Sequence, residues 1–143
     1  MTPEPSTPAP LLISSFSDTS YSKELCLLSH VLTTALAGDK VSVYNAIEDF
    51  GKNLDSSGLW LKVAGGNKAE VLSAVVCREP LCGNILEIGT YCGYSAIRMA
   101  IVCPGVRIIS LEVYPRHVLI KRPVCICMLD SYCRCVDRST YSQ

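Results

Sequence analysis

Residues 85–112 read ILEIGTYCGYSAIRMAIVCPGVRIISLE, and this stretch decides the fold. Its apolar start predicts a short strand over 84–88, and the glycines predict a turn over 89–93. A helix is expected over 94–102, ended by a proline and a glycine, and β-branched residues predict a second strand over 106–111. Two strands joined through a helix lie parallel with a right-handed crossover. The stretch therefore indicates an α/β fold.

Three helices are expected before this unit. Apolar residues at helical spacing begin at Ser22 and run toward a stop at Gly38, and a second helix over 40–50 is ended by Gly51. A third helix is expected over 67–78. The same spacing predicts inward-facing apolar side chains, among them Leu25, Leu32, Val71 and Val75.

The 143 residues divide by composition into three parts, and this length allows one domain at most. Residues 1–21 are rich in proline, serine and threonine and are expected to be disordered. Residues 22–120 carry all the expected helices and strands and form a partial domain. Residues 121–143 form a cysteine-rich tail of uncertain structure, because Pro123 stands where a helix would continue and no periodicity is sustained.

Composition excludes several classes of partner. The formal net charge is zero and the pI is about 6.7, which leaves no electrostatic footprint for nucleic acid or an anionic membrane. No apolar run approaches the roughly 18 residues that span a bilayer. The N-terminus lacks a secretory signal, so we expect a cytoplasmic protein whose nine cysteines are thiols.

Glu87 precedes the glycine turn, at the carboxyl end of the first predicted strand, where ligands of open α/β sheets bind. Gly89 allows a ligand to approach the backbone, and the start of the following helix offers N–H groups that suit a carboxylate. The carboxylate of Glu87 suits an ammonium group. An amino-acid moiety with both charges therefore fits this corner better than a pyrophosphate, and the loop lacks the G-x-G-x-x-G pattern of dinucleotide sites.

Glu112 ends the second predicted strand, about 23 residues after Gly89 (112 − 89), near the spacing at which an acid binds ribose hydroxyls. A lone glycine turn is usually only a turn, and a lone acid at a strand end is usually solvated. The combination of strand, turn, helix, strand and acid favours a binding site. It predicts a ligand that joins an amino acid to a nucleoside, and S-adenosylmethionine is the common metabolite of that shape.

Four segments of the chain resemble the catechol O-methyltransferase family. LEIGTYCGYSAIRMA is similar to the family's cofactor-binding motif, and PGVRIISLEVYP to its second strand and ribose-binding acid. SVYNAIEDF resembles the second helix, and LWLKVAGGNKAEVLSAVV the approach to the third. The resemblance covers residues 25–120 and only the N-terminal part of the family. It implies a Rossmann-like class I methyltransferase fold, incomplete, with the N-terminal helices and the first β-α-β unit, and makes residues 22–120 a partial S-adenosylmethionine-binding domain.

The resemblance also implies a role for each matching position. Glu87 and Ser95 would contact the methionine end of the cofactor, in a corner shaped by Gly89 and Tyr91. Glu112 would hold the ribose. The implied cofactor-binding positions are, in full, Ala64, which would touch the cofactor through its backbone, Glu87, Gly89, Tyr91, Ser95 and Glu112.

Three further residues lie in the segment that leads into the third helix. Trp60 would help to wall a catechol pocket according to the resemblance, while ordinary packing remains an equal alternative. Lys62 departs from the family, which often has an apolar residue lining the methyl donor, although the lysine stem can still pack. Lys68 is expected to be solvated.

The resemblance implies a magnesium ion and a lysine base that this sequence does not identify. Asp130 and Asp137 are the only carboxylates after Glu112, and neither they nor Lys121 can be assigned, so we name no catalytic and no metal-binding residue. The expected function is methyl transfer from S-adenosylmethionine to a small catechol-type hydroxyl, by a truncated chain of low or no activity alone. The oligomeric state is left open.

Two alternatives to an active enzyme remain. The chain can be a non-catalytic fragment that binds the cofactor or a partner. A zinc site built from the cysteines of the tail is weaker, because structural zinc sites more often use C-x₂₋₄-C spacing. The cysteines concerned are Cys125, Cys127, Cys133 and Cys135.

Overall fold

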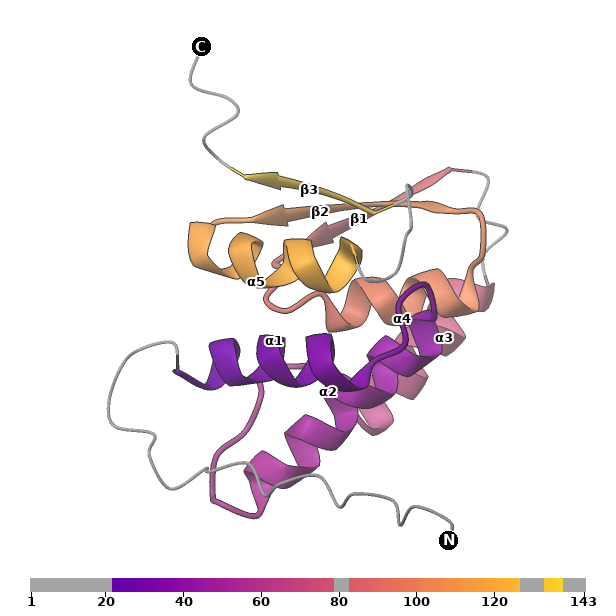
Figure 1. Ribbon diagram of the computed structural model, residues 1–143. Helices are drawn as coiled ribbons and strands as arrows, with labels where there is room; N and C mark the ends of the chain where they lie inside the picture. Colours follow the sequence, from indigo (N-terminus) through magenta and orange to yellow (C-terminus); the bar gives the residue numbers. More distant parts are fainter. Residues whose placement is uncertain (1–21, 79–82, 127–132, 138–143) are drawn as a thin grey trace, which may run out of the picture.

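The computed structural model describes residues 22–78, 83–126 and 133–137, with the side chains described up to residue 124 (Figure 1). In these ranges three helices come first, and strands then alternate with two further helices, as expected for an α/β protein. They are α1 (Ser22–Thr34), α2 (Lys40–Asp55), α3 (Asn67–Arg78), β1 (Asn84–Ile88), α4 (Tyr94–Val102), β2 (Arg107–Glu112), α5 (Pro115–Ile126) and β3 (Cys133–Asp137).

The strands form one parallel sheet in the order β1-β2-β3. In the β1–β2 register, Glu87 lies opposite Ser110 and Ile88 opposite Leu111. The ladder continues past β1 as a hydrogen bond of 2.9 Å from the Gly89 N–H to the Leu111 carbonyl. The predicted β-α-β unit is confirmed, with β1 and α4 at their predicted bounds and β2 shifted by one residue.

The expectation that regular structure ends near Ile120 is wrong. Helix α5 continues to Ile126 with Pro123 inside it, and β3 then pairs with β2 along its whole length. A proline removes one helical N–H, whose partner would be the carbonyl of Leu119. Leu119 is 66% exposed and lies on the solvent side of α5, where water can satisfy that carbonyl. Strand β3 depends on pairing with β2, which a local pattern does not reveal.

All the helices lie on one side of the sheet (Figure 1). Helices α4 and α5 contact β2, α5 also contacts β3, and α1 packs against α2 and α5. The main core lies among these helices and includes Leu27, Ile47, Phe50, Ile97 and Val124, each at most 2% exposed. No helix among the described residues covers the other face of the sheet, a bare apolar surface where Leu86 is 60% and Ile88 82% exposed.

In two helices, apolar side chains that the sequence predicts to face inward are exposed to solvent. In α1, Leu25 and Leu32 are exposed, because the buried stripe runs through Leu27 and Val31 instead. In α3, Val71 and Val75 are exposed, and the helix contacts α4 through its other side. A helix has one buried stripe about 100° wide, so apolar residues outside that stripe reach solvent unless another element covers them.

Helix α2 passes through the residue predicted to end it. Gly51 lies within the helix, and the apolar stripe that buries Ile47 and Phe50 continues to Leu54, which is 1% exposed. Burying Leu54 offsets the roughly 1 kcal/mol that an interior glycine costs. None of the helices in the described ranges is both long and apolar enough to cross a membrane.

The start of α2 gives a stability prediction. The carboxylate of Asp39 accepts hydrogen bonds from the N–H groups of Val41 (2.9 Å) and Ser42 (3.1 Å). Asp39→Ala should therefore lower the free energy of unfolding by about 1 kcal/mol in urea titrations followed by circular dichroism. Asn45→Ala, at an exposed position of the same helix, is the control and should change it by less than about 0.5 kcal/mol. Equal effects of the two changes would contradict the cap.

Candidate functional site: a ligand corner at the carboxyl ends of β1 and β2

Residues 89–93 form a tight turn between β1 and α4. Gly89 and Gly93 both have φ of +85°, a conformation that side chains rarely adopt. The Gly93 N–H donates to the Thr90 carbonyl over 2.9 Å and closes the turn. A Cβ at Gly89 would meet nothing within 4 Å, so this part of the backbone is open to a ligand.

The N-terminus of α4 is open. Its capping residue is Gly93, which has no side chain to accept a hydrogen bond from the first-turn N–H groups. Ser95, the second residue of the helix, is half-buried beside them. The Tyr94 N–H donates to the Cys92 thiol. The N–H groups that follow it have no capping side chain from Gly93, and with the positive end of the helix dipole they favour an anion here. The predicted carboxylate position thus has the backbone geometry it needs.

Glu87 is half-buried near the end of β1, on the face of the sheet that the helices cover. The hydroxyl of Ser110, its neighbour across the ladder, donates to Oε2 of Glu87. Burial raises the pKa of Glu87, while the Ser110 hydroxyl and the charge of Lys121 act in the opposite direction. Burial prevails, so ionised Glu87 is less stable than a carboxylate in water and gains from a cationic ligand.

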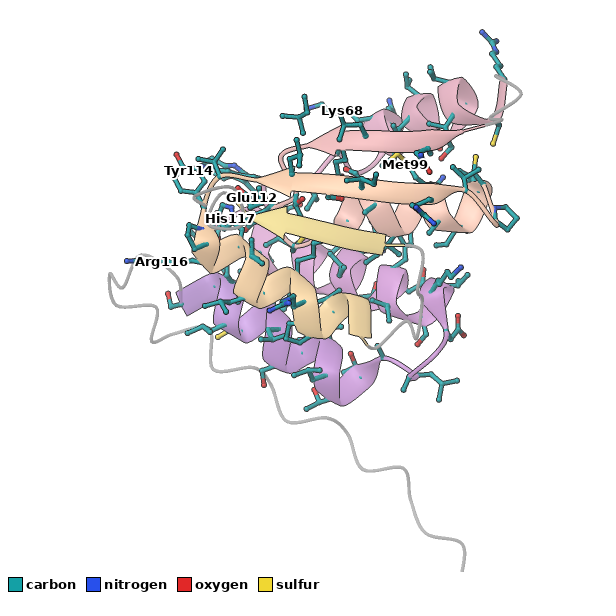
Figure 2. All side chains as sticks on the ribbon, turned by 90° about the horizontal axis from the view of Figure 1, so that it is seen from above. Lys68, Met99, Glu112, Tyr114, Arg116 and His117 are labelled. Carbon is teal, nitrogen blue, oxygen red and sulfur yellow. The ribbon has the colours of Figure 1, made fainter. Side chains whose placement is uncertain are left out.

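Glu112 is 6% exposed at the end of β2, and backbone amides surround it. Oε2 accepts from the N–H groups of Thr90 (3.0 Å) and Tyr91 (2.9 Å), and Oε1 accepts from Tyr114 (2.9 Å). His117 Nδ1 lies 3.4 Å from Oε2, and Figure 2 shows Glu112, Tyr114 and His117 together. Of the roughly four acceptor positions of a carboxylate, these amides use three, which leaves one on Oε1 for a hydroxyl.

The same contacts set the charge of Glu112. Burial alone would raise its pKa, but the N–H groups of Tyr114, Tyr91 and Thr90 and the charge of His117 more than offset it. The net pKa lies below the ordinary value, so Glu112 is ionised at neutral pH. Glu112 and the turn therefore form one hydrogen-bonded unit, which the sequence did not predict.

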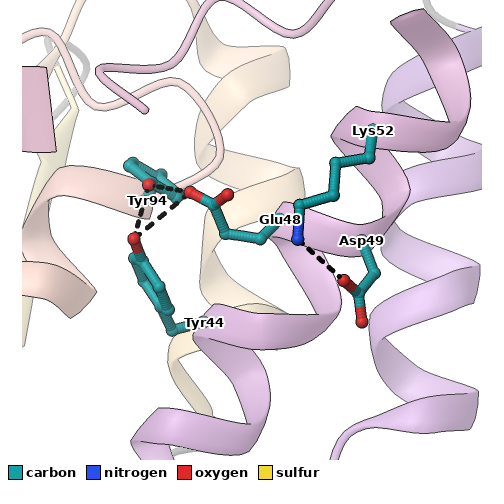
Figure 3. A network of polar contacts seen from close by, with 5 residues as sticks. All are labelled: Tyr44, Glu48, Asp49, Lys52 and Tyr94. Atoms are coloured by element: carbon teal, nitrogen blue, oxygen red, sulfur yellow. Dashed lines mark hydrogen bonds and ion pairs between the residues drawn. The ribbon is translucent and has the colours of Figure 1, made fainter. Parts of the chain in front are cut away.

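Ala64 lies in the segment between α2 and α3, which reaches the start of α4. A Cβ at its neighbour Gly65 would lie 3.6 Å from both the Tyr94 hydroxyl and Oε1 of Glu48. Tyr94 donates to Glu48 and exchanges a hydrogen bond of 2.8 Å with Tyr44 (Figure 3). Burial and these hydrogen bonds raise the pKa of Tyr94, which stays a neutral donor. The network thus places the Ala64 segment next to the helix turn that carries Ser95.

Trp60 does not pack in the core. It is 64% exposed and lines a cleft of about 320 Å³ between α2, the Ala64 segment and Tyr94. Lys68 lines the same cleft and is exposed, as predicted, and so is Lys62. The exposure of Trp60 excludes core packing, while packing within the loop and a role in a catechol pocket both stay open.

Sequence reasoning missed three side chains with unsatisfied buried atoms. Glu24 of α1, Thr90 of the turn and Lys121 of α5 are each at least 94% buried, and Glu24 Oε2, Thr90 Oγ1 and Lys121 Nζ have no hydrogen-bond partner in the described part of the chain. The other oxygen of Glu24 accepts from the Tyr91 hydroxyl over 2.7 Å. The spacing of these residues gave no signal, because they meet only through the packing of α1 and α5 on the turn.

The described residues do not build a metal centre. Within the ranges whose side chains the structure describes, no three or more His, Cys, Asp or Glu side chains come together. Asp130 and Cys127 lie outside the described residues, and the side chains of Cys125, Cys133, Cys135 and Asp137 are not described, so the zinc alternative stays a prediction.

This chain is similar in sequence to known proteins. No protein-family model matches the chain. It is 39% identical over 102 residues to the catechol O-methyltransferase of Bos taurus, a match that spans 71% of this chain and 36% of the bovine protein. It is 34% identical over 90 residues to the transmembrane O-methyltransferase of Homo sapiens, across 62% of this chain and 29% of that protein.

Among solved structures, the chain resembles a Staphylococcus aureus protein provisionally named a caffeoyl-CoA O-methyltransferase. The TM-score is 0.53 at 15% identity, and the match spans 80% of this chain and 49% of that one, which concerns the fold alone. The expected resemblance and the incomplete Rossmann-like class I methyltransferase fold are both confirmed. The chain spans about a third of the length of the curated relatives it matches.

Proposed function

We propose, on the premise that this chain is homologous to part of the catechol O-methyltransferases, that it binds S-adenosylmethionine as the donor-binding part of an O-methyltransferase. The acceptor we propose is a small molecule with a catechol-type hydroxyl. The corner formed by Glu87, the open start of α4 and Glu112 carries the proposal. Its charges match an ammonium, a carboxylate and a ribose hydroxyl in that order.

The described residues fit such a donor. Glu87 is a half-buried acid that a cation would stabilise, and Gly89 leaves the backbone accessible above it. The N–H groups beside Ser95 lack a capping side chain and would receive a carboxylate. One acceptor position of Glu112 is open for a ribose hydroxyl. The backbone of Ala64 and the phenol ring of Tyr91 complete the proposed contacts.

Bound S-adenosylmethionine would supply an electrophilic methyl group. The chain's own contribution is to fix the amino-acid and ribose ends, which holds the donor in one orientation and excludes water from the buried acids. Magnesium, which the family resemblance implies, is not accommodated by the described residues, so no step is assigned to it. We therefore propose donor binding with little or no turnover by this chain alone.

Calorimetric titration of the full chain with S-adenosylmethionine tests the proposal. We expect saturable binding with one site per chain and a dissociation constant in the micromolar range, about −8 kcal/mol. Adenosine alone is the control and should bind at least tenfold more weakly, because it lacks the amino-acid end. No binding of the donor by a sample that circular dichroism shows to be folded would refute the proposal.

An interaction fragment is the second candidate, and the bare apolar surface around Leu86 and Ile88 is the observation in its favour. The two candidates differ in a methylation assay with a catechol and magnesium. Turnover would identify an enzyme, whereas donor binding without turnover would identify a binding fragment.

A further inference from the structure

Lys121 is a buried cation without a hydrogen-bond partner among the described residues. It lies on α5 between Ile120 and Arg122, is 1% exposed, and its Nζ contacts no acceptor there. Burying an ammonium group costs several kcal/mol unless nearby charge compensates it. The charge of Lys121 acts on Glu87, which makes that acid the candidate for the compensation.

The stem of Lys121 lies against the turn of the ligand corner. A Cβ at Gly93 would stand 3.2 Å from Cγ of Lys121, 3.7 Å from Cε and 3.8 Å from Cδ. The missing side chain of Gly93 is thus what leaves room for the lysine. This contact brings an α5 side chain to the cap of α4, close to the acids that precede and follow the turn.

Three acids lie at the turn against which Lys121 packs. The charge of Lys121 acts on Glu87 of β1. Glu112 of β2 accepts from the Thr90 and Tyr91 N–H groups, and Glu24 of α1 accepts from the Tyr91 hydroxyl. Glu24 and Glu87 both act on the buried thiol of Cys92, whose pKa burial raises to about 12, so that thiol carries no charge. His117 pairs with Glu112, and Lys23 lies 3.9 Å from Glu24.

We propose that Lys121 is a positioning residue of the donor corner and that its buried ammonium is the counter-charge of Glu87. The inference rests on the proposed function, in which Glu87 binds the ammonium of the donor. Lys121 does not touch the donor in this proposal. It stabilises the ionised form of Glu87 before the donor arrives, and through Gly93 it supports the turn that opens α4.

The charge of Lys121 determines the direction in which the pKa of Glu87 changes when the lysine is removed. Burial raises the pKa of Glu87, and Lys121 opposes that change together with the Ser110 hydroxyl, while Glu112 adds to it. Without Lys121 the pKa of Glu87 moves further up, so Glu87 takes up its proton at a higher pH than in the wild type. Donor binding that needs the carboxylate then requires a higher pH.

The first test is made without donor. Lys121→Met keeps the length of the side chain and removes the charge, and ¹³C NMR follows the titration of the Glu87 carboxyl in the full chain. We expect the Glu87 midpoint to lie higher in the variant than in the wild type. Lys68→Met, at an exposed lysine of α3, is the matched control and should leave it unchanged. An unchanged midpoint in Lys121→Met would overturn the inference.

Donor affinity across pH gives the second readout. If the wild type binds S-adenosylmethionine, Lys121→Met should bind it about tenfold more weakly at a pH between the two Glu87 midpoints found by NMR, and should approach wild-type affinity as the pH rises. Lys121→Arg, which restores the charge, should recover most of the loss. If the wild type does not bind the donor, the proposed function fails, whereas the NMR titration still decides the role of Lys121.

A double variant tests the pairing even if Lys121→Met folds poorly. If Glu87 and Lys121 are counter-charges, Lys121→Met leaves a buried carboxylate alone, and adding Glu87→Gln removes it. We therefore expect Lys121→Met/Glu87→Gln to be more stable than Lys121→Met. A double variant no more stable than the single one would contradict the pairing.

Discussion

Replacing Glu87 by glutamine should weaken S-adenosylmethionine binding by about 10- to 100-fold, the range of a lost charge-assisted hydrogen bond. Glutamine keeps the shape of the side chain and an acceptor for the Ser110 hydroxyl, so the change removes only the charge. Calorimetric titration of the full chain at pH 7 measures the effect. Glu70→Gln, at an exposed acid in the first turn of α3, is the control and should bind like the wild type.

The free energy of unfolding of the same variant depends on two opposing effects. The pKa of Glu87 is raised in the folded chain, so the folded chain holds the proton more tightly than the unfolded one and loses stability as the pH rises through that pKa. Glutamine removes this loss, but it also removes the counter-charge proposed for the buried Lys121, so Glu87→Gln should be less stable at pH 7 than Lys121→Met/Glu87→Gln. Unaltered donor affinity in a folded Glu87→Gln sample would rule out Glu87 as the ammonium site.

Replacing Glu112 by alanine should lower the free energy of unfolding at pH 7 by about 3 kcal/mol. The change leaves the N–H groups of Thr90, Tyr91 and Tyr114 without their acceptor, and each unsatisfied buried donor costs about 1–3 kcal/mol unless water reaches it. Urea unfolding followed by circular dichroism measures the loss, with Glu70→Ala as the control at less than about 0.5 kcal/mol.

The Glu112 effect should also depend on pH. The pKa of Glu112 is lowered in the folded chain, so its contribution is fully present above the ordinary carboxyl pKa and is lost as the pH falls through the lowered value. The difference in stability between the wild type and Glu112→Ala should therefore shrink on acidification. A difference that stays constant from neutral to acid pH would show that the carboxylate does not hold the turn.

Local pattern was sufficient where the chain folds through near neighbours. Strand β1, helix α3 and helix α4 have their predicted bounds, because apolar spacing and the flanking glycines specify them. The pattern failed at Gly51 and Pro123, where buried Leu54 and pairing beyond α5 outweigh the local preference for a break. Strand β3 was missed for the same reason, since its place depends on β2.

The residues of the candidate site could likewise be predicted only where a local pattern marks them. Glu87 and Glu112 could be singled out because each is an acid at the carboxyl end of an apolar strand. Ser110 left a weak signal, as the one small polar residue that the strand register places opposite Glu87. Lys121 and Glu24 left none, because α1 and α5 bring them to the turn from almost a hundred residues apart. Contacts of that kind depend on the packed structure and not on spacing.

The one-sided arrangement of the helices has a practical consequence for handling this chain. A parallel sheet normally has helices on both faces. Here the described helices cover only one face, and Leu86 and Ile88 on the other face are exposed to solvent. Purified material should therefore self-associate as its concentration rises, and light scattering would register this well before any thermal unfolding. A mild detergent that covers Leu86 and Ile88, or a soluble fusion carrier, should keep it monodisperse.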